Sequence, residues 1–402
     1  MLIAIILAGG YGERLLPLTK KEPKPIIPFC NRPMMEYQIE ALSSIGISIV
    51  AFCVSYLPKL LEKEARRICK KYKIVPLFSY EKSPLGTAGA IRQCIDGVLH
   101  SYTSSLSKNT PIFVLNSDII CTSYPFQSLL DYYQMLSKHM QPVSGIISVT
   151  QVDDPSAFGV VESHSLVDSL PRISEPSLVG SDISRVNGFH EKPQVFISNL
   201  INAGMYVLSL GTILSIPSSR IVSLERESFP SWCKDGSLLC LTGQGLWGDV
   251  GKPESYLKMS IDYLKQSFPP QKLFLDSSSS SSSPRLSMEI HGDKTTALSL
   301  PSLSSLKPIS SPGDADCFAS ATSLLYDDSI DVSASSTIKH CIIGSNVVIG
   351  DGCDVERCVI MERVVLHGCH LVDCIIGKGV TLEGRKYTKK MIVDGEEITS
   401  IR

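Results

Sequence analysis

A glycine-rich stretch follows an apolar run near the start of the chain. It reads Leu7-Ala8-Gly9-Gly10-Tyr11-Gly12-Glu13-Arg14-Leu15. The preceding run, Leu2 to Leu7, predicts a fully buried strand, so the glycines open a loop at the end of that strand. Glycine backbone can approach an anion closely, and Arg14 and Lys24 supply the positive charge that a triphosphate requires. The stretch therefore predicts a nucleotide-binding loop.

Two commoner glycine loops do not fit this stretch. A P-loop ends in a Lys-Ser or Lys-Thr pair, and none follows Gly12. The dinucleotide fingerprint needs a third glycine where the chain has Leu15. A tight turn without a ligand remains an alternative for the glycines alone, and the spacing of Arg14 and Lys24 favours a phosphate site over it.

Strand and helix patterns alternate after this loop, which predicts a parallel sheet covered by helices. A helix is expected from Pro33 to just before Gly46, followed by a strand from Ile47 to Val54. A later apolar strand, Pro111 to Leu115, is followed closely by Asp118. Ligands of such sheets bind at the carboxyl ends of the strands, where the glycine loop and Asp118 would both lie.

Composition excludes several classes of protein. The 402 residues suggest two domains, and 38 basic against 40 acidic residues provide no overall field for nucleic acid or a membrane surface. The 13 cysteines contain no Cys-x-x-Cys pair, which favours reduced structural thiols over a zinc site or disulfides. The apolar start is too short to span a membrane or to act as a signal peptide, so we expect a cytoplasmic protein.

The composition changes after about Gln266. A serine tract runs from Ser277 to Ser283, and residues 266–325 are expected to form a disordered Ser/Pro-rich linker. Beyond it, aliphatic residues recur every six positions, with slips of frame, as at Ile343, Ile349 and Val355. Such hexads are typical of a parallel β-helix, with ordinary alternating strands as the alternative.

The segment from Leu7 to Pro28 resembles the signature of the sugar-1-phosphate nucleotidyltransferases. Further matching segments follow in the order of that family: Pro84 to Gly89, Val114 to Asp118, Phe158 to Val161, Glu191 to Pro193, Asn202 to Tyr206 and Trp247 to Gly251. The resemblance covers residues 1–265 well and the remainder loosely. Within the family, the run from Glu191 to Tyr206 is most similar to members that transfer guanylyl groups to mannose 1-phosphate.

The resemblance implies a fold and partners. It implies an α/β, Rossmann-like catalytic domain with a mostly parallel sheet over residues 1–265, and a short left-handed parallel β-helix over residues 326–402. Family members often assemble through this second domain, which implies a homo-oligomer or a complex with a related regulatory subunit.

The implied reaction is attack by mannose 1-phosphate on the α-phosphorus of GTP, which gives GDP-mannose and pyrophosphate. The attacking phosphate oxygen is already ionised, so no general base is needed, and catalysis rests on positioning and electrostatics. A related enzyme with another base or sugar, and a non-catalytic regulatory relative, remain alternatives. The intact motifs favour catalysis over the regulatory alternative.

The resemblance also implies roles for individual residues. Arg14, Lys24 and Lys192 would act on the phosphates, and Asp118 and Asp249 would hold Mg²⁺. Sugar-phosphate contacts would come from Gly159, Glu191, Lys192, Asn202 and Asp249. Nucleotide contacts would come from Leu7, Ala8, Gly9, Gly10, Gly12, Arg14, Lys24, Leu85, Gly86 and Asp118.

Overall fold

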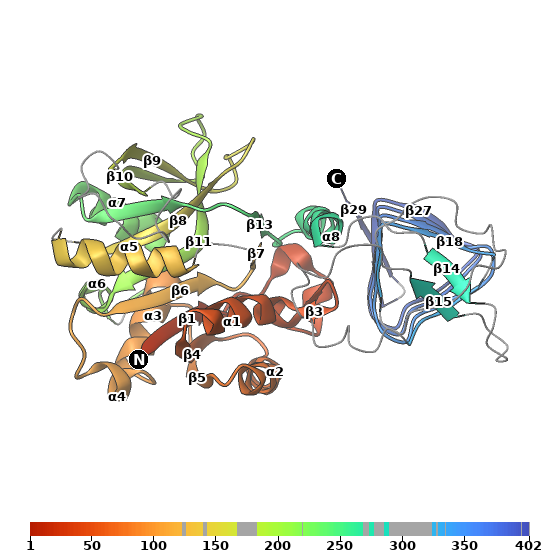
Figure 1. The fold of residues 1–402 in the computed structure, drawn as a ribbon, viewed down its shortest axis with the longest axis horizontal. Coiled ribbons are helices and arrows are strands. Elements are labelled where there is room, and N and C mark those ends of the chain that lie inside the picture. Colours follow the sequence, from red (N-terminus) through yellow and green to blue (C-terminus); the bar gives the residue numbers. More distant parts are fainter. Residues whose placement is uncertain are drawn as a thin grey trace. The chain divides into compact units, whose positions relative to one another are not determined.

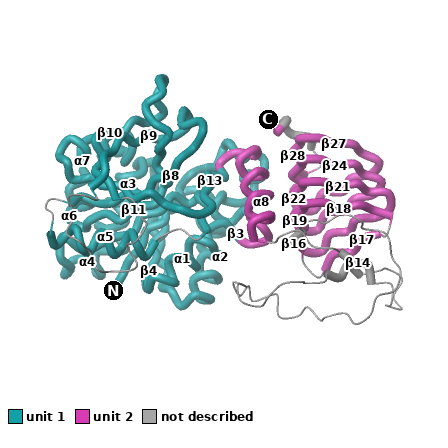
Figure 2. Tube along the Cα trace, turned by 45° about the horizontal axis from the view of Figure 1, so that its top comes forward, with its two compact units in different colours: residues 1–27, 33–250 teal, residues 28–32, 251–402 magenta. Residues whose placement is uncertain are grey.

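The computed structural model describes residues 1–122, 126–139, 143–166, 183–218, 220–267, 273–276, 285–288, 324–326, 329–333, 335–394 and 396–401. The chain forms two compact units. Unit 1 comprises Met1–Ile27 and Pro33–Val250, and unit 2 comprises Pro28–Arg32 and Gly251–Arg402 (Figure 2).

Unit 1 is built on a nine-stranded sheet with the order β5-β4-β1-β6-β11-β8-β12-β10-β9 (Figure 1). Pairing is parallel across β5-β4-β1-β6 and between β8 and β12, and antiparallel at the other neighbouring pairs. The expected α/β fold is confirmed, and its sheet is mixed. The strands are β1 (Leu2–Leu7), β4 (Ile47–Val54), β5 (Val75–Tyr80), β6 (Pro111–Asn116), β8 (Gly145–Gln151), β9 (Gly159–Ser165), β10 (Ile183–Glu191), β11 (Leu200–Ser209) and β12 (Leu238–Thr242).

Helices cover both faces of this sheet. Strand β1 divides its side chains between two hydrophobic clusters, with Ala4 and Ile6 in one and Ile3 and Ile5 in the other. Burying each isoleucine contributes about 1.5–3 kcal/mol. The first cluster includes side chains of α1 (Met34–Ser44), α2 (Pro58–Lys71) and α5 (Phe126–His139), and the second includes those of α3 (Gly86–Asp96), α6 (Leu210–Ser215) and α7 (Phe229–Lys234). A short helix, α4 (His100–Thr103), follows α3.

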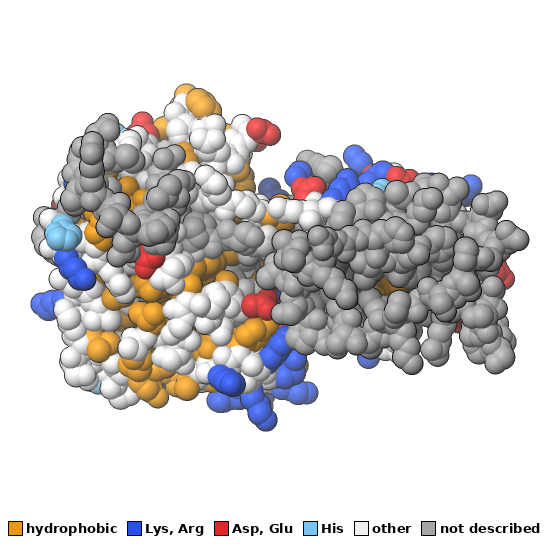
Figure 3. All heavy atoms as spheres, viewed as in Figure 1, with side chains coloured by type: hydrophobic (Ala, Val, Ile, Leu, Met, Phe, Trp, Pro, Cys, Tyr) orange, Lys and Arg blue, Asp and Glu red, His pale blue; other side chains and the backbone are white. Residues whose placement is uncertain are grey.

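Lysine and arginine side chains gather over α2 on the face seen in Figure 3. Three basic side chains of α2 pair with carboxylates, namely Arg66 with Glu62 at 2.8 Å, Arg67 with Glu64 at 2.6 Å and Lys71 with Glu36 at 2.6 Å. The surface of this helix therefore carries charges of both signs.

Unit 2 contains α8 (Pro253–Ser267) and a parallel β-helix. Its strands stack in three sheets, so that Ile342 pairs with Val359, and Val359 pairs with Ile375 one turn later. Aliphatic and cysteine side chains fill the interior. The hexad prediction of a β-helix is confirmed, and the alternative of ordinary alternating strands is wrong.

The three sheets of the β-helix comprise short strands. The first contains β16 (Leu324–Leu325), β19 (Cys341–Ile343), β22 (Val359–Ile360), β25 (Ile375–Ile376), β28 (Lys390–Val393) and β29 (Glu396–Ser400). The second contains β17 (Asp331–Val332), β20 (Val348–Ile349), β23 (Val365–His367) and β26 (Thr381–Glu383). The third contains β18 (Thr337–Lys339), β21 (Asp354–Glu356), β24 (His370–Val372) and β27 (Lys386–Thr388).

The segment predicted as a linker contains two short strands, β14 (Leu273–Asp276) and β15 (Arg285–Met288), which pair antiparallel. Its serine tract, Ser277 to Ser283, lies outside the described residues. The twelve cysteines that the structure describes are all buried and free. Within the described ranges, no helix combines the length and the apolar character needed to cross a membrane.

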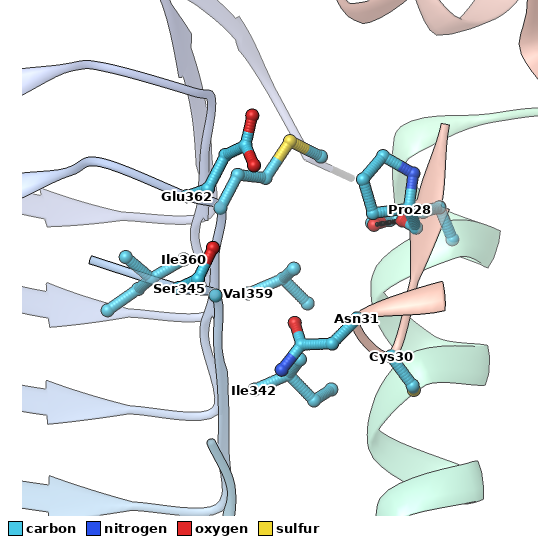
Figure 4. A pocket seen from close by; sticks show the side chains of 11 residues that line it. Pro28, Cys30, Asn31, Ile342, Ser345, Val359, Ile360 and Glu362 are labelled. Atoms are coloured by element: carbon cyan, nitrogen blue, oxygen red, sulfur yellow. Dashed lines mark hydrogen bonds between the residues drawn. The ribbon is translucent and has the colours of Figure 1, made fainter. Parts of the chain in front are cut away.

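Unit 2 also contains a cavity of about 110 Å³. It is lined by the tip of the turn at Cys30 and Asn31, by Tyr256 of α8 and by β-helix residues such as Val359 and Glu362 (Figure 4). Asn31 Nδ2 donates a hydrogen bond to the carbonyl oxygen of Ile343 at 2.8 Å. None of the site residues predicted from the sequence lines this cavity, and those residues all lie in unit 1.

Candidate functional site

The glycine loop leaves β1 as predicted and is fixed to the neighbouring strand end. The amide of Ala8 donates to the carbonyl of Cys53 at 2.9 Å, and Ser55 Oγ donates to the carbonyl of Gly9. Gly12 has a φ of +67°, and a Cβ there would meet Thr19 Cγ2 at 2.8 Å. Only glycine fits this position without strain.

The loop presents backbone donors. In the part of the chain that the structure describes, no protein group accepts a hydrogen bond from the amides of residues 9–12. A Cβ at Gly10 would meet nothing within 4 Å, and the Arg14 side chain is exposed. Consecutive free amides can bind an anion where their N–H groups converge.

Lys24 joins the loop to the end of β6. It begins the 3₁₀-helix η3 (Lys24–Ile26) between Pro23 and Pro25. Its Nζ lies 2.7 Å from Asp118 Oδ2, and the two side chains are 9% and 25% exposed. The structure thus brings together two residues that are 94 positions apart in the sequence.

Asp118 and Asp249 lie next to each other where two short strands pair. Asp118 directly precedes β7 (Ile119–Thr122), and Asp249 is the last residue of β13 (Leu246–Asp249). The two strands pair antiparallel, with Asp249 opposite Ile119. The amide of Val250 donates to the carbonyl of Asp118 at 3.0 Å. Mg²⁺ commonly takes one or two carboxylates together with substrate phosphates, so this pair of oxygen donors fits that ion. The described residues contain no cluster of three or more His, Cys, Asp or Glu that could enclose a metal.

Gly159, Glu191 and Lys192 meet at the ends of β9 and β10. Gly159 is paired with Glu191, and the amide of Lys192 donates to the carbonyl of Phe158 at 2.9 Å. A Cβ at Gly159 would meet the ring of Phe189 at 2.5 Å and Glu191 Oε2 at 3.2 Å. The Lys192 side chain is 55% exposed, and its Nζ lies 3.2 Å from Glu191 Oε1.

A bulge in β11 places Asn202 beside these residues. The pairing of β11 with β8 shifts register between Asn202 and Tyr206, and Ile201 pairs with Val160 of β9. Asn202 Nδ2 donates to Tyr206 Oη at 2.9 Å, and its Oδ1 accepts from the amide of Gly204 at 3.0 Å. Burial, followed by the nearby carboxylate of Glu225, raises the pKa of Tyr206 well above its usual value. Tyr206 therefore stays a neutral phenol.

The same bulge connects the two halves of the site. Gly204 has a φ of +75°, and a Cβ there would meet Ile119 Cγ1 at 2.9 Å, next to Asp118. Trp247 Nε1 donates to the carbonyl of Ala203 at 2.9 Å. The glycine loop, the two aspartates and the Glu191–Asn202 group consequently lie along one edge of the sheet.

Leu85 and Gly86 begin α3 and are held by a neighbouring segment. Val222 donates its amide to the carbonyl of Leu85 at 2.8 Å, and its own carbonyl accepts from Ala88 at 3.0 Å and Gly89 at 3.2 Å. Thr87 Oγ1 donates to Glu225 Oε2 at 2.8 Å and accepts from the amide of Leu224 at 2.8 Å. Glu225 belongs to a single π-helical turn, η6 (Leu224–Ser228), a feature frequent at functional sites.

Glu81 was not predicted as a site residue. Its Oε1 lies 2.8 Å from where a Gly9 Cβ would be, and its Oε2 accepts from the amide of Leu85 at 3.2 Å. Burial raises the pKa of this carboxyl, and the bond from the Leu85 amide lowers it by a smaller amount. The signal in the sequence was a carboxylate directly after an apolar strand and just before the Pro84 to Gly89 segment.

Gln38 is a second unpredicted residue. Its Nε2 donates to the carbonyls of Asn116 at 2.7 Å and Ile119 at 3.0 Å, on both sides of Asp118. It therefore fixes the backbone that carries this aspartate. The sequence gives no signal for it, because Gln38 lies inside an ordinary helix.

Comparisons with known proteins agree with this arrangement. The profile of the family described as "Nucleotidyl transferase" matches residues 3–266, and that of "GlmU-like, C-terminal hexapeptide" matches residues 318–388. A solved structure of UDP-glucose pyrophosphorylase with UDP-glucose has a TM-score of 0.51 and 21% identity, and the match covers 66% of this chain and 99% of that chain. At this identity the likeness supports the fold alone.

Curated relatives are more similar in sequence. The chain is 39% identical over 262 residues to "Mannose-1-phosphate guanylyltransferase catalytic subunit beta" of Danio rerio. It is 38% identical over 262 residues to "Mannose-1-phosphate guanyltransferase" of Aspergillus oryzae. Each match covers 65% of this chain and 64% of the relative. The family profile spans most of unit 1, which also carries the glycine loop and the two aspartates. The chain therefore belongs to the nucleotidyl transferase family.

Proposed function

We propose that this chain transfers GMP from GTP to mannose 1-phosphate and releases pyrophosphate and GDP-mannose. The observation that carries the proposal is the contact between the glycine-loop segment and the carboxyl end of β6, where Lys24 Nζ lies 2.7 Å from Asp118 Oδ2. The names of the relatives support this pair of substrates.

Positive charge and backbone amides would neutralise the triphosphate. The amides of residues 9–12 would bind phosphate oxygens, and Arg14 and Lys24 would offset the charge that develops on the leaving pyrophosphate. Asp118 and Asp249 would hold Mg²⁺, which supplies charge neutralisation at the transferring phosphate when bound.

The carboxylate of Glu81 supports guanine as the base. Guanine presents an N–H at N1 and an amino group at C2 side by side, and one carboxylate can accept from both. Adenine presents a lone pair at N1 beside its amino group at C6, so only one of the two bonds could form and N1 would face a carboxylate oxygen, a costly mismatch at a half-buried site. Glu81 lies between Gly9 and Leu85, which are both expected to contact the nucleotide.

The second half of the site would bind the sugar phosphate. Lys192 would pair with its phosphate, and Glu191 and Asn202 would bond to hexose hydroxyls. The ring of Phe189 next to Gly159 leaves no room for a side chain there, so the backbone itself can close on the sugar.

Pyrophosphate release tests the proposal. The purified full-length protein is assayed with Mg²⁺, with GTP, ATP or dTTP crossed against mannose 1-phosphate or glucose 1-phosphate. We expect release with GTP and mannose 1-phosphate, and a rise of about tenfold or more in the KM for GTP in Glu81→Gln. Release with another pair would reassign the substrates, and no release with any pair would favour a regulatory subunit.

We further propose that residues 326–402 serve assembly, with a second copy of the chain or with a related regulatory subunit. The hexapeptide repeat and the family resemblance support this role. In this scheme residues 1–265 are catalytic and residues 266–325 connect the two domains. Light scattering of the full-length protein during size-exclusion chromatography would measure its mass, and a strictly monomeric protein would contradict the homo-oligomer. The twelve cysteines that the structure describes are free, which supports a reducing compartment, and we propose the cytoplasm.

A further inference from the structure

The ion pair between Lys24 and Asp118 occupies a carboxylate that the proposed reaction also needs for a metal. The Lys24 side chain is only 9% exposed, and a lysine is rarely buried to this extent without a partner. Its ammonium is bonded to Asp118 Oδ2 at 2.7 Å. A buried charge that loses its partner is strongly destabilising, so separating Lys24 from Asp118 is unfavourable unless another anion takes the place of Asp118.

The surrounding structure fixes both partners. On one side, Pro23 and Pro25 flank Lys24, and a Cβ at Gly12 would lie 3.4 Å from Lys24 Cβ. On the other, the backbone around Asp118 is tied by Gln38 and by the amide of Val250. A backbone shift that carried Asp118 away from Lys24 would break these hydrogen bonds.

The pair has an electrostatic consequence for cations. A divalent cation bound to the same carboxylate would lie beside the Lys24 ammonium, and like charges repel strongly when they are partly shielded from water. The triphosphate of a nucleotide carries enough negative charge to accept both the ammonium and the metal. With the nucleotide present, Lys24 can therefore bond to a phosphate and leave Asp118 to the metal.

We propose that Lys24 is the resident counterion of Asp118 and keeps divalent cations off this carboxylate until a nucleotide arrives, so that metal and nucleotide enter together. The inference rests on the proposed nucleotidyl transfer, because it takes Asp118 as a metal ligand. It assigns Lys24 a role before catalysis, in addition to its expected contact with the phosphates.

Binding of Mn²⁺ alone tests the inference. Mn²⁺ accepts the same oxygen ligands as Mg²⁺, and its free form is measured directly by electron paramagnetic resonance. The full-length protein is titrated without nucleotide or sugar phosphate, as wild type and as Lys24→Met, Lys24→Arg and the double variant Lys24→Met/Asp118→Asn. Lys20→Met, at an exposed lysine of the same loop, is the matched control.

We expect Lys24→Met to bind Mn²⁺ at least about tenfold more tightly than wild type, because a neighbouring positive charge has been removed. Lys24→Arg and Lys20→Met should bind like wild type, and the double variant should lose the gain. Equal affinity of wild type and Lys24→Met would overturn the inference. If Lys24→Met does not fold by circular dichroism, Lys24→Gln takes its place under the same criterion. Wild-type binding at about 10 μM or tighter without nucleotide would also overturn it.

The measurement separates this inference from the proposed substrates. It contains no GTP and no sugar phosphate, so an incorrect base or sugar leaves its result unchanged. Conversely, the protein could be an active guanylyltransferase while its Lys24→Met variant gains no affinity for Mn²⁺. The proposed function would then stand, and the counterion role of Lys24 would be refuted.

Discussion

The two lysines of the candidate site lie in contrasting surroundings. Lys24, on the side proposed to bind the nucleotide (the nucleotide side), is 9% exposed, flanked by prolines and bonded to Asp118. Lys192, on the side proposed to bind the sugar phosphate (the sugar-phosphate side), is 55% exposed and has a φ of +51°. Its ammonium lies 3.2 Å from Glu191, a contact that solvent weakens.

This contrast indicates that the nucleotide side is built before any ligand arrives, whereas the sugar-phosphate side stays open. A preformed site binds with little loss of conformational freedom, and an open one must order its side chains on binding. Substitutions of closely packed residues on the nucleotide side should therefore affect both stability and GTP binding. Those on the sugar-phosphate side should affect the second substrate and leave stability almost unchanged.

The largest effect is expected from Asp249→Asn, because Asp249 would serve both sides. Removing a carboxylate proposed to hold Mg²⁺ should lower kcat by about a thousandfold, while the melting temperature stays close to that of wild type. Steady-state pyrophosphate release and thermal melts measure the two quantities. Asp235→Asn, at an exposed aspartate of the same unit, is the control. Full turnover in Asp249→Asn would discard the model with two aspartates.

Lys192→Met tests the open side. We expect the KM for mannose 1-phosphate to rise by roughly tenfold to a hundredfold, because one charge-assisted bond to the phosphate is lost. The KM for GTP and the melting temperature should change little, since this side chain is mostly exposed. An equal rise in both KM values would show that the two sides are not separate. Lys192→Arg keeps the charge and should recover part of the affinity.

Thr87→Val tests how the nucleotide side is supported. The change removes the bond from Thr87 to Glu225 and the bond from the Leu224 amide to Thr87, so the loop at Leu85 and Gly86 loses two of its ties. We expect the KM for GTP to rise by about tenfold, with the KM for mannose 1-phosphate unchanged. Thr87→Ser retains the hydroxyl and should behave like wild type. If both variants lost GTP affinity equally, the hydroxyl would not be the cause.

Two neighbouring glycines give the smallest and most specific effects. Gly12→Ala places a Cβ 2.8 Å from Thr19 Cγ2 at a positive φ, which should cost about 1–3 kcal/mol in the free energy of unfolding. Gly10→Ala meets nothing within 4 Å and should leave that free energy unchanged while weakening GTP binding. Urea unfolding and GTP titration of both proteins measure these effects. Destabilisation by Gly10→Ala would show that the loop is not preformed as described.

Local patterns in the sequence predicted much of the fold. Strand β1 has the bounds expected from its apolar run, and β4 runs from Ile47 to Val54 as expected. The hexads predicted the β-helix because each turn repeats the same inward positions. These features depend on nearby residues alone, which is why a single sequence reveals them.

Other features depend on pairings between distant segments and could not be predicted. The bulge in β11 lies in a strand that pairs with β6, β8 and β9. The bond between Lys24 and Asp118 and the position of Glu81 beside Gly9 likewise need the folded sheet. The antiparallel half of the sheet was missed for the same reason, since strand direction is set by connections and partners rather than by the apolar pattern.

A single competition reaction tests which base and which sugar phosphate the protein uses. The full-length protein is incubated with Mg²⁺, equal amounts of GTP, ATP, UTP and dTTP, carbon-13-labelled mannose 1-phosphate and unlabelled glucose 1-phosphate. Mass spectrometry of the nucleotide sugars then reports base and sugar together. We expect labelled GDP-mannose to dominate the products. A product with another base, or with the unlabelled hexose, would contradict it.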